Sequence, residues 1–306
     1  MNIKAIIKNP FKVFYHFNYT KISHLLSDKA LIKLLYRARL GYKMDFNNPE
    51  SFNQKIQWLK INNRDPVLST LVDKYEVRKY IADRIGSEYL IPLYGVWDSF
   101  DEIDFSKLPD QFVIKCTHDS GSVIVCRDKS RFDIEDARKK LNAALSENFY
   151  LRGREWPYKN VKPRIIIEKY MENTDQTKND NIVEGLIDYK FYCFRGEVKY
   201  LYVSKGLENH ATARISFLNP DWTRADFYRA DFKPFEELPE KPTHYNKMIE
   251  VSELLSKDFP FLRVDLYEIN NHVYFSELTF SPCNGFMPFV PMEKDFEIGR
   301  LMQLPD

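Results

Sequence analysis

The spacing of apolar residues changes along the chain, from a helical period in the first ninety residues to short strand-like runs after them. A mainly 3.6-residue period predicts a first amphipathic helix around Leu31, Ile32, Leu34, Leu35 and Tyr36. Residues 48–51 (NPES) supply stop and cap chemistry, so a second helix is expected over 52–61. A third is expected after Asp65-Pro66, running from 68 to Gly86.

After Gly86 the runs become short and rich in β-branched and aromatic residues. Segments 111–116 (QFVIKC) and 122–126 (SVIVC) flank the polar turn 117–121, which predicts a hairpin. A helix is expected over 134–150. It leads through a proline-containing connector to a strand over 164–171.

The C-terminal part alternates strand-like pairs with one long helical pattern. The expected strands are 186–194 and 197–205 around Arg195-Gly196, and 261–269 and 273–278 around 270–272, with an exposed loop at 172–181 and a helix at 243–259. These elements predict an α+β protein built on antiparallel strands. We expect three parts: a helical region (1–90), a small β-rich unit (91–171) and a larger α+β unit (172–306).

The composition is that of an ordinary globular protein and narrows the choice of partners. Hydrophobic residues make up 44% of the 306 residues, and 45 Lys and Arg against 44 Asp and Glu leave a formal charge of +1. That balance argues against nucleic acid as the main partner, because phosphate binding needs a basic excess. The four cysteines are far apart, without a C-x-x-C pair, and the six histidines lack zinc-site spacing. We expect reduced, mostly buried cysteines.

The N-terminal stretch 1–17 is basic, but its longest apolar run is too short for a signal peptide or a membrane span. Neither secretion nor a transmembrane segment is therefore expected. An amphipathic segment here can dock onto the protein's own core, which is the simpler alternative. Contact with a membrane surface stays open.

Asp265 and Glu277 lie one on each strand of the last expected hairpin. A two-residue turn at Asn270-Asn271 would point their side chains to opposite faces, whereas a three-residue loop, 270–272, would set them directly across from each other. Asn tolerates the left-handed conformation that such a loop needs. Facing carboxylates repel unless a cation lies between them, and oxygen ligands suit Mg²⁺. The alternative is an exposed acidic pair on a solvated hairpin.

Three basic residues and one polar turn complete the candidate chemistry. Lys115 and Lys190 lie in apolar strands, where a lysine must face solvent or meet an anionic group. Arg263, two residues before Asp265, is expected on the same face. The turn 117–122 holds one of only ten glycines and can aim backbone N–H groups at a phosphate. Structural salt bridges and a plain turn are the competing explanations.

Taken in order, these segments resemble the ATP-grasp superfamily, and most closely its TupA-like branch, named for teichuronopeptide biosynthesis. The resemblance extends from Phe46 to Met302. It is carried by residues 46–60, 71–81, 89–109, 112–122, 160–171, 188–202, 218–227 and 263–282. It implies a fold in which two α+β subdomains with antiparallel sheets grip ATP, after a helical N-terminal region.

The resemblance also implies roles for individual residues. Lys115 and Lys190 would contact nucleotide phosphates, and Arg263 would lie beside the reacting carboxylate, with Lys190 and Arg263 as catalytic residues. Asp265 and Glu277 would hold Mg²⁺. The remaining ATP-binding residues it implies are His118, Ser120, Gly121 and Ser122 of the phosphate loop, and Glu168 and Tyr170 at the adenine.

Two positions depart from the family pattern. Asp119 stands where a glycine is expected after the histidine of the phosphate loop, so it must point outward or have a metal or basic partner. Glu277-Leu278-Thr279 replaces the common E-x-N, which removes an amide ligand of the metal. Asn284 is a possible substitute for it.

The implied activity is a cytoplasmic bacterial carboxylate–amine ligase that uses ATP and Mg²⁺, acts through an acyl phosphate and releases ADP and phosphate. The implied substrates are an amino acid and a uronic acid of a capsular or cell-wall polysaccharide or its precursor, with the inner membrane face as an open location. A polysaccharide glycosyltransferase and a degenerate nucleotide-binding module are the alternatives. Further candidate substrate contacts are His210, Arg214, Trp222, Asp73, Lys74 and Arg78, of which the last three could equally form a solvated helix face.

Overall fold

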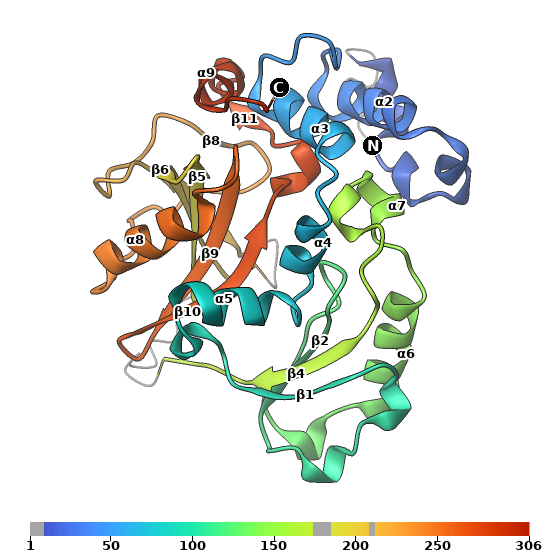
Figure 1. The fold of residues 1–306 in the computed structure, drawn as a ribbon, viewed down its shortest axis with the longest axis vertical. Coiled ribbons are helices and arrows are strands. Elements are labelled where there is room, and N and C mark those ends of the chain that lie inside the picture. The colour runs from blue at the N-terminus through green and yellow to red at the C-terminus, as the bar shows by residue number, and fades with distance from the viewer. Residues whose placement is uncertain (1–8, 174–184, 208–211, 306) are drawn as a thin grey trace.

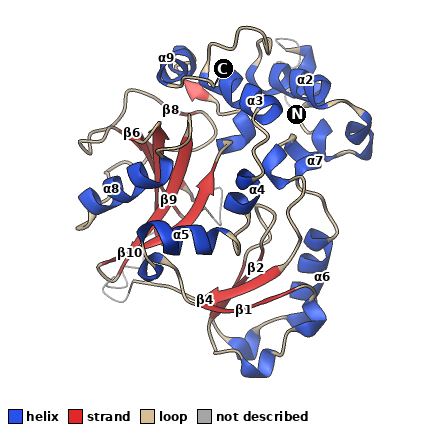
Figure 2. Ribbon diagram, viewed as in Figure 1, coloured by secondary structure: helices blue, strands red, loops and turns tan. Residues whose placement is uncertain are grey.

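Two antiparallel sheets form the frame of the protein, and helices cover their outer faces (Figure 1). The structure, a computed structural model, describes residues 9–173, 185–207 and 212–305. Its α-helices are α2 (Asp28–Leu40), α3 (Phe52–Asn62), α4 (Val67–Val72), α5 (Val77–Ile85), α6 (Ile134–Leu145), α7 (Tyr150–Gly153), α8 (Tyr245–Ser256) and α9 (Glu293–Leu301). The expected α+β class is confirmed (Figure 2).

The smaller sheet has the strand order β1-β4-β2-β3. Its strands are β1 (Leu93–Trp97), β2 (Phe112–Cys116), β3 (Ile124–Cys126) and β4 (Ile165–Lys169). The predicted β2–β3 hairpin is confirmed. Alternate residues of β2 and β4, such as Phe112 and Ile167, pack with α6 in one core. Because side chains alternate along a strand, Lys115 and Glu168 share the opposite face.

The larger sheet has the order β10-β9-β5-β6-β7. Its strands are β5 (Ile187–Phe194), β6 (Glu197–Lys205), β7 (Arg214–Leu218), β9 (Leu262–Ile269) and β10 (His272–Thr279), while β8 (Tyr228–Arg229) pairs with β11 (Phe289–Val290). Helix α8 packs its apolar stripe against one face through residues such as Met248 and Leu255. On the other face, aromatic side chains pack around Phe52 of α3. The charged residues of the sheet lie beside this aromatic cluster.

The third expected helix, 68–86, is broken into α4 and α5 at Asp73. This residue has an extended backbone, with φ −75° and ψ 117°. Its carboxylate accepts the backbone N–H groups of Tyr75 at 2.8 Å and Glu76 at 3.1 Å, and pairs with Arg164 at 2.9 Å. Local side-chain bonds of this kind compete with the helix, so the chain turns here. The helix expected over 134–150 likewise ends earlier, at Leu145.

The N-terminal residues fold as three short 3-10 helices, η1 (Pro10–Phe14), η2 (Phe17–Tyr19) and η3 (Lys21–Leu25). They dock onto the body of the protein. The side chain of Asn18 donates to the carbonyl of Arg152 at 2.9 Å, and the buried Ser23 bonds back to Thr20. Among the residues that the structure describes, no helix has the length and apolar character needed to cross a membrane.

The cysteines behave as expected from their spacing. Cys116, Cys126 and Cys193 are buried, Cys283 is half-buried, and all four are free thiols. Burial raises the pKa of Cys116 to about 11 and that of Cys193 to about 12, so these two stay protonated at neutral pH.

Candidate functional site

A row of charged residues crosses three neighbouring strands of the larger sheet. Glu277 of β10 lies directly opposite Asp265 of β9, which in turn lies opposite Lys190 of β5. Asp265 is fully buried, whereas the side chain of Glu277 is 39% exposed. The row therefore runs from a sealed centre toward an accessible edge.

The pairing of Asp265 with Glu277 arises differently from either expected register. The turn has two residues, Asn270 and Asn271, both with positive φ, and this turn alone would set Asp265 opposite Ser276. A β-bulge between Phe275 and Glu277 adds one residue and brings Glu277 opposite Asp265. The prediction that Asp265 and Glu277 can face each other is therefore confirmed, but the three-residue loop that was expected to pair them is wrong.

Arg263 bridges the two carboxylates, as its position two residues before Asp265 predicts. Its Nε and Nη2 donate to Oδ1 and Oδ2 of Asp265, both at 2.7 Å, and Nη2 also donates to Oε1 of Glu277 at 2.7 Å. A two-pronged guanidinium–carboxylate pair of this kind fixes direction as well as charge. Thr279 adds a hydroxyl bond to the same Glu277 oxygen at 3.2 Å.

The two carboxyl groups have opposite pKa shifts. Burial raises the pKa of Asp265 to about 6, although Arg263 and Lys190 oppose the effect. Burial acts in the same direction on Glu277, but Arg263, Lys190 and Lys74 outweigh it and hold its pKa at about 2. Two close carboxyl groups titrate as a pair, and here the more exposed member, Glu277, loses its proton at the lower pH.

Lys190 is held as a cation by two acids. Its Nζ lies 3.0 Å from Oδ2 of Asp265 and 3.2 Å from Oδ1 of Asp188. Burial lowers the pKa of Lys190, but Asp188 and Asp265 outweigh it, so the net shift is upward. A buried lysine was expected to meet an anionic group, and it does.

On the smaller sheet, Lys115 and Glu168 form an ion pair of 2.6 Å between Nζ and Oε2. Arg78, from α5, lies 3.2 Å from the other oxygen of Glu168. Arg78 and the buried Asp73 thus join α4 and α5 to the smaller sheet. The proposed solvated helix face is wrong for these two residues.

The polar loop after β2 presents unused backbone donors. Among the described residues, no acceptor receives a backbone N–H from His118, Asp119, Ser120, Gly121 or Ser122. Gly121 has φ +115°, a conformation that favours glycine. A run of free N–H groups in one loop suits an anion.

Side chains of this loop hold it in place. The ring of His118 is buried and donates from Nε2 to the carbonyl of Ala144 at 3.1 Å, so the imidazole points away from the open side of the loop. Asp119 accepts the hydroxyl of Ser122 at 2.6 Å, and Lys74 donates to the Asp119 carbonyl. Lys74 thus bonds to the backbone of Asp119, and the Asp119 carboxylate, which was expected to point outward or to have a metal or basic partner, lies within electrostatic reach of Lys74.

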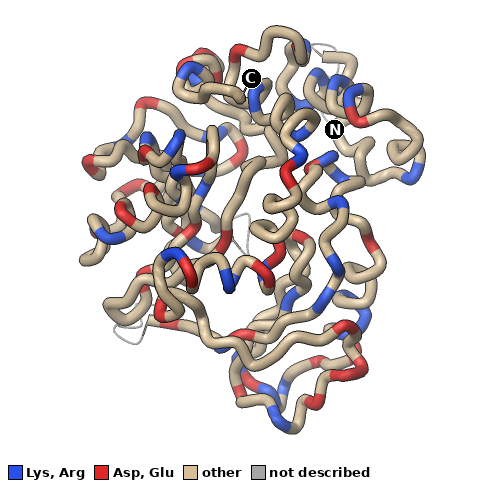
Figure 3. The backbone as a smooth tube through the Cα atoms, in the orientation of Figure 1, with Lys and Arg blue, Asp and Glu red and all other residues tan. Residues whose placement is uncertain are grey.

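Lys74 also connects the two charged clusters. Burial lowers its pKa, while the charges of Asp119 and Glu277 raise it and that of Lys115 lowers it. It therefore lies within electrostatic reach of both sheets, from the junction of α4 and α5. Figure 3 shows that positions of Lys and Arg and of Asp and Glu are interspersed along the backbone of both sheets and of the segments that join them.

Glu155, Tyr158 and Lys60 also belong to this region, and the sequence patterns did not single them out. Burial raises the pKa of Glu155 to about 7, with Lys60 opposing and Glu277 adding to the shift. Burial raises the pKa of Tyr158 as well, the charges of Glu155 and Glu277 raise it further, and that of Arg263 lowers it. One available signal was a glutamate beside Trp156-Pro157-Tyr158, an acidic residue in an aromatic, proline-containing connector.

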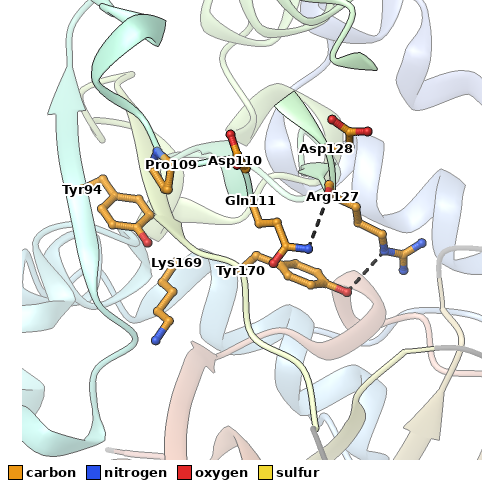
Figure 4. Close-up of a pocket in the computed structure, with 8 residues that line it drawn as sticks. All are labelled: Tyr94, Pro109, Asp110, Gln111, Arg127, Asp128, Lys169 and Tyr170. Carbon is orange, nitrogen blue, oxygen red and sulfur yellow. Dashed lines mark hydrogen bonds between the residues drawn. The ribbon is translucent and has the colours of Figure 1, made fainter. Parts of the chain in front are cut away.

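Tyr170 lies away from this cluster, at an open pocket of about 580 Å³ beside the end of β4 (Figure 4). Its hydroxyl accepts from Nε of Arg127 at 3.3 Å. The pocket is lined by Tyr94, Pro109, Asp110, Gln111, Arg127, Asp128, Lys169 and Tyr170.

The remaining candidates have other partners or lie outside the described residues. The ring of Trp222 packs against Tyr189 and Tyr245 at the edge of the core under α8. Arg214 donates to the backbone carbonyls of Thr212 and Ala213. His210 and residues 174–181 of the expected loop lie outside the described residues.

Asn284, considered as a substitute metal ligand, is engaged elsewhere. Its side-chain oxygen and its backbone carbonyl both accept from Nζ of Lys60. Within the described ranges, no group of three or more His, Cys, Asp or Glu residues is arranged to hold a metal. Asp265 and Glu277 therefore remain the proposed metal ligands.

Comparison with known proteins gives one family match. A family model described as TupA-like ATPgrasp matches residues 54–303. A search of curated proteins found no match.

Among solved structures, D-alanine–D-alanine ligase from Bacillus anthracis complexed with ATP shares 15% identity at a TM-score of 0.40, covering 70% of this chain and 56% of that one. D-cycloserine synthetase DcsG shares 14% identity at a TM-score of 0.39, with coverage of 77% and 71%. The ATP-grasp ligase PsnB, complexed with a variant of its minimal precursor, Mg and ADP, shares 10% at 0.38, with coverage of 83% and 62%. This chain thus spans little more than half of the first of these proteins.

Proposed function

This chain belongs to the TupA-like ATP-grasp family, and from that premise we propose that it is an ATP- and Mg²⁺-dependent ligase that joins a carboxylate to an amine. The carboxylate oxygen attacks the γ-phosphorus of ATP, and ADP leaves. The amine nitrogen then attacks the carbonyl carbon of the acyl phosphate, phosphate leaves and the nitrogen loses a proton. The observation that carries the proposal is the Glu277–Asp265–Lys190 row together with the loop of free N–H groups, both of which lie within electrostatic reach of Lys74.

The triphosphate would lie between the two sheets. The free N–H groups of residues 118–122 would donate to its oxygens, and Lys115 would exchange Glu168 for a phosphate. Lys190 and Lys74 supply further positive charge nearby. Glu168 and Tyr170 remain our candidates for the adenine end.

The two facing carboxylates fit a magnesium ion by their unused acceptor positions. Oδ1 of Asp265 accepts one hydrogen bond, from Arg263, and Oε2 of Glu277 accepts none from the described residues. Mg²⁺ takes one or two carboxylates and completes its shell with water and phosphate oxygens. When bound there, it would neutralise charge on the phosphate oxygens.

No nucleophile from the protein is needed in this reaction. Arg263 is fixed by Asp265 and Glu277, so its guanidinium is pre-oriented for an oxygen that gains negative charge as the amine adds. Most of the acceleration would come from positioning two substrates and stabilising charge, the usual source of catalysis in phosphoryl transfer.

For the substrates, we propose the uronic acid of a capsular or cell-wall polysaccharide, or its precursor, and an amino acid. The support for this choice is the family to which the chain belongs. The proposed place of the reaction is the bacterial cytoplasm.

The test is an incubation of the full chain with ATP, Mg²⁺, glucuronic acid and a mixture of amino acids. We expect release of ADP that depends on both substrates, and an amide detectable by mass spectrometry. A glycosyltransferase would give no ADP release that depends on the acceptor. ATP binding without turnover across a broad panel of acids and amines would instead indicate a nucleotide-binding module.

A further inference from the structure

Glu155 is a buried carboxylate without a partner. It precedes the short helix η8 (Trp156–Tyr158) and is 9% exposed. Among the described residues, none donates a hydrogen bond to its carboxylate or forms an ion pair with it. Its oxygens are also absent from the unpartnered polar atoms that are sealed from solvent, so both retain some access to it.

The position of Glu155 is fixed by its neighbours. Arg154 is buried and donates to the backbone carbonyls of Ser23 at 2.9 Å and Leu26 at 3.2 Å. Gly153 packs so closely against Asn284 that a β-carbon there would lie 1.5 Å from its side-chain nitrogen. Because both preceding residues are fixed by close contacts, the backbone holds the Glu155 carboxylate in its buried position.

Lys60 is the charged residue with the largest influence on the pKa of Glu155, but its Nζ already has its own acceptors. Its Nζ donates to Oε1 of Gln57 at 2.8 Å and to the carbonyl and side-chain oxygens of Asn284. An ammonium group has three hydrogens, and all three are used. Arg263 is the other cation that affects the pKa of Glu155, and it is bound to Asp265 and Glu277.

We propose that Glu155 binds the protonated amine of the second substrate, an inference that rests on the proposed ligase function. Burying an unpaired carboxylate is costly, and an incoming ammonium group relieves that cost. Glu155 lies within electrostatic reach of Arg263 and Glu277, so an ammonium group held there would wait beside the carbonyl carbon that the first step activates, and it would attack that carbon after losing one proton.

The first experiment measures binding by thermal unfolding. Wild type, Glu155→Gln and the control Glu147→Gln, whose side chain is exposed and paired with Arg152, are heated with the Mg²⁺ complex of a non-hydrolysable ATP analogue. Each of the twenty amino acids is added, free or N-acetylated. We expect at least one free amino acid to raise the Tm of wild type and the control but not of Glu155→Gln, and the acetylated form to have no effect.

Two outcomes of that experiment would overturn the inference. One is an equal shift in Glu155→Gln and wild type, or no shift with any free amino acid. The other is a ligand-free Glu155→Gln protein that melts clearly below wild type, because that would mean the carboxylate has a structural partner. We expect its Tm to equal or exceed that of wild type.

A second experiment separates this inference from the ligase proposal. Hydroxylamine is uncharged at neutral pH and captures acyl phosphates. Glu155→Gln should therefore form hydroxamate at the wild-type rate, keep its KM for ATP and show at least a tenfold higher KM for the amino acid. If wild type forms neither ADP nor hydroxamate, the ligase proposal fails, while the thermal shifts still decide the role of Glu155.

A different observation concerns the N-terminal surface, defined here as the exposed side chains of Val13, Phe14, Tyr15, Tyr19, Ile22 and Leu25. Their exposed fractions run from 36% to 85%. The backbone beneath them is anchored: Nη2 of Arg39 donates to the carbonyl of Tyr15 at 3.1 Å and to Oδ1 of Asn18 at 2.7 Å. These apolar groups therefore belong to a docked segment and still face solvent.

The segment that forms the N-terminal surface carries positive charge only, and Glu147, an acid that contacts link to it, is paired with Arg152, which lies over the ring of Tyr19. Residues 1–27 contain four lysines and no Asp or Glu, and Lys21 is exposed within the surface itself. Aromatic and aliphatic groups with lysines are the combination that lies in the interface of an anionic bilayer. We infer that the N-terminal surface docks onto an anionic lipid membrane.

The test is co-sedimentation of the full chain with vesicles of phosphatidylcholine, with or without phosphatidylglycerol. We expect binding that needs the anionic lipid, weakens with salt and falls at least tenfold in Ile22→Ser/Leu25→Ser, but not in the control Leu254→Ser, an exposed leucine of α8. Equal binding by the double variant would overturn the inference. So would a wild-type dimer that the double variant loses, since the surface would then join two copies.

Discussion

At the scale of single residues, the site is built from charges that already have partners. Arg263 links Asp265 and Glu277, and Lys115 is paired with Glu168. Phosphate and Mg²⁺ would replace some of these contacts, so the pairs keep the side chains oriented before the substrates arrive. Glu155 differs because no residue in the described part of the chain donates to its carboxylate or forms an ion pair with it.

We expect Asp265→Asn or Glu277→Gln to lower turnover by about a hundredfold or more while the protein still folds, because the charge that holds the cation is lost. ADP release at saturating ATP and circular dichroism measure the two effects. Asp258→Asn, an exposed carboxylate paired with Arg84, is the matched control. Wild-type rates in either site variant would disprove the assigned metal site.

The pH dependence of the free energy of unfolding should reveal the cost of burying the charge of Glu155. Its pKa is raised by burial to about 7, above the usual value near 4.5. A raised pKa means that the contribution of Glu155 to stability is fully present below about pH 4.5 and is lost as the pH rises through 7. Glu155→Gln should therefore match wild type at pH 5 and exceed its free energy of unfolding at pH 8, measured by urea titration. A constant difference over this range would contradict the assignment.

At the scale of elements, the β9–β10 hairpin determines where the acidic pair lies. Its turn needs two left-handed residues, Asn270 with φ 49° and Asn271 with φ 62°, and the bulge at Ser276 shifts the register by one. In a regular hairpin with the same turn, the side chains of Glu277 and Asp265 would point to different faces of the sheet.

Asn271→Val should lower the free energy of unfolding by about 1–2 kcal/mol, because a β-branched residue is strained in the left-handed region. Asn271→Gly has no such strain and should leave stability close to that of wild type. Urea denaturation of both variants makes the comparison. If the valine variant is as stable as the glycine variant, the turn does not have the conformation described here.

At the scale of the whole molecule, the junction of α4 and α5 holds the two sheets in relation to each other. Asp73 pairs with Arg164, Arg78 with Glu168, and Lys74 donates to the loop after β2. Lys74 also lies within electrostatic reach of Glu277 on the larger sheet. Leu71 of α4 and Val77 and Ile81 of α5 pack into the core of the larger sheet, so one broken helix supplies contacts to both sheets.

Lys74→Met should weaken the binding of a non-hydrolysable ATP analogue about tenfold, because a half-buried positive charge beside the loop proposed to bind the phosphates is lost. Isothermal titration calorimetry measures the change in Kd. Lys79→Met, an exposed lysine of α5 paired with Asp83, should bind as wild type does. Equal affinity of both variants would remove Lys74 from the nucleotide site.

Local patterns were sufficient to predict much of the fold. The helices around Leu31 and over 52–61, the β2–β3 hairpin and the strands on either side of Arg195-Gly196 follow from periodicity and turn residues. The break at Asp73 was not predicted, since apolar spacing continues through it and the partner of its carboxylate is Arg164, ninety-one residues away.

The sequence by itself determined the elements and the kinds of residue that had to meet: an arginine and two acids near one hairpin, and lysines in apolar strands that needed anionic partners. Only the tertiary structure decided which side chains meet, because a bulge, a broken helix and a connector bring together residues far apart in the chain. Glu155 is the clearest case. Its burial without a partner is a property of the packed space around it, and no local pattern encodes that space.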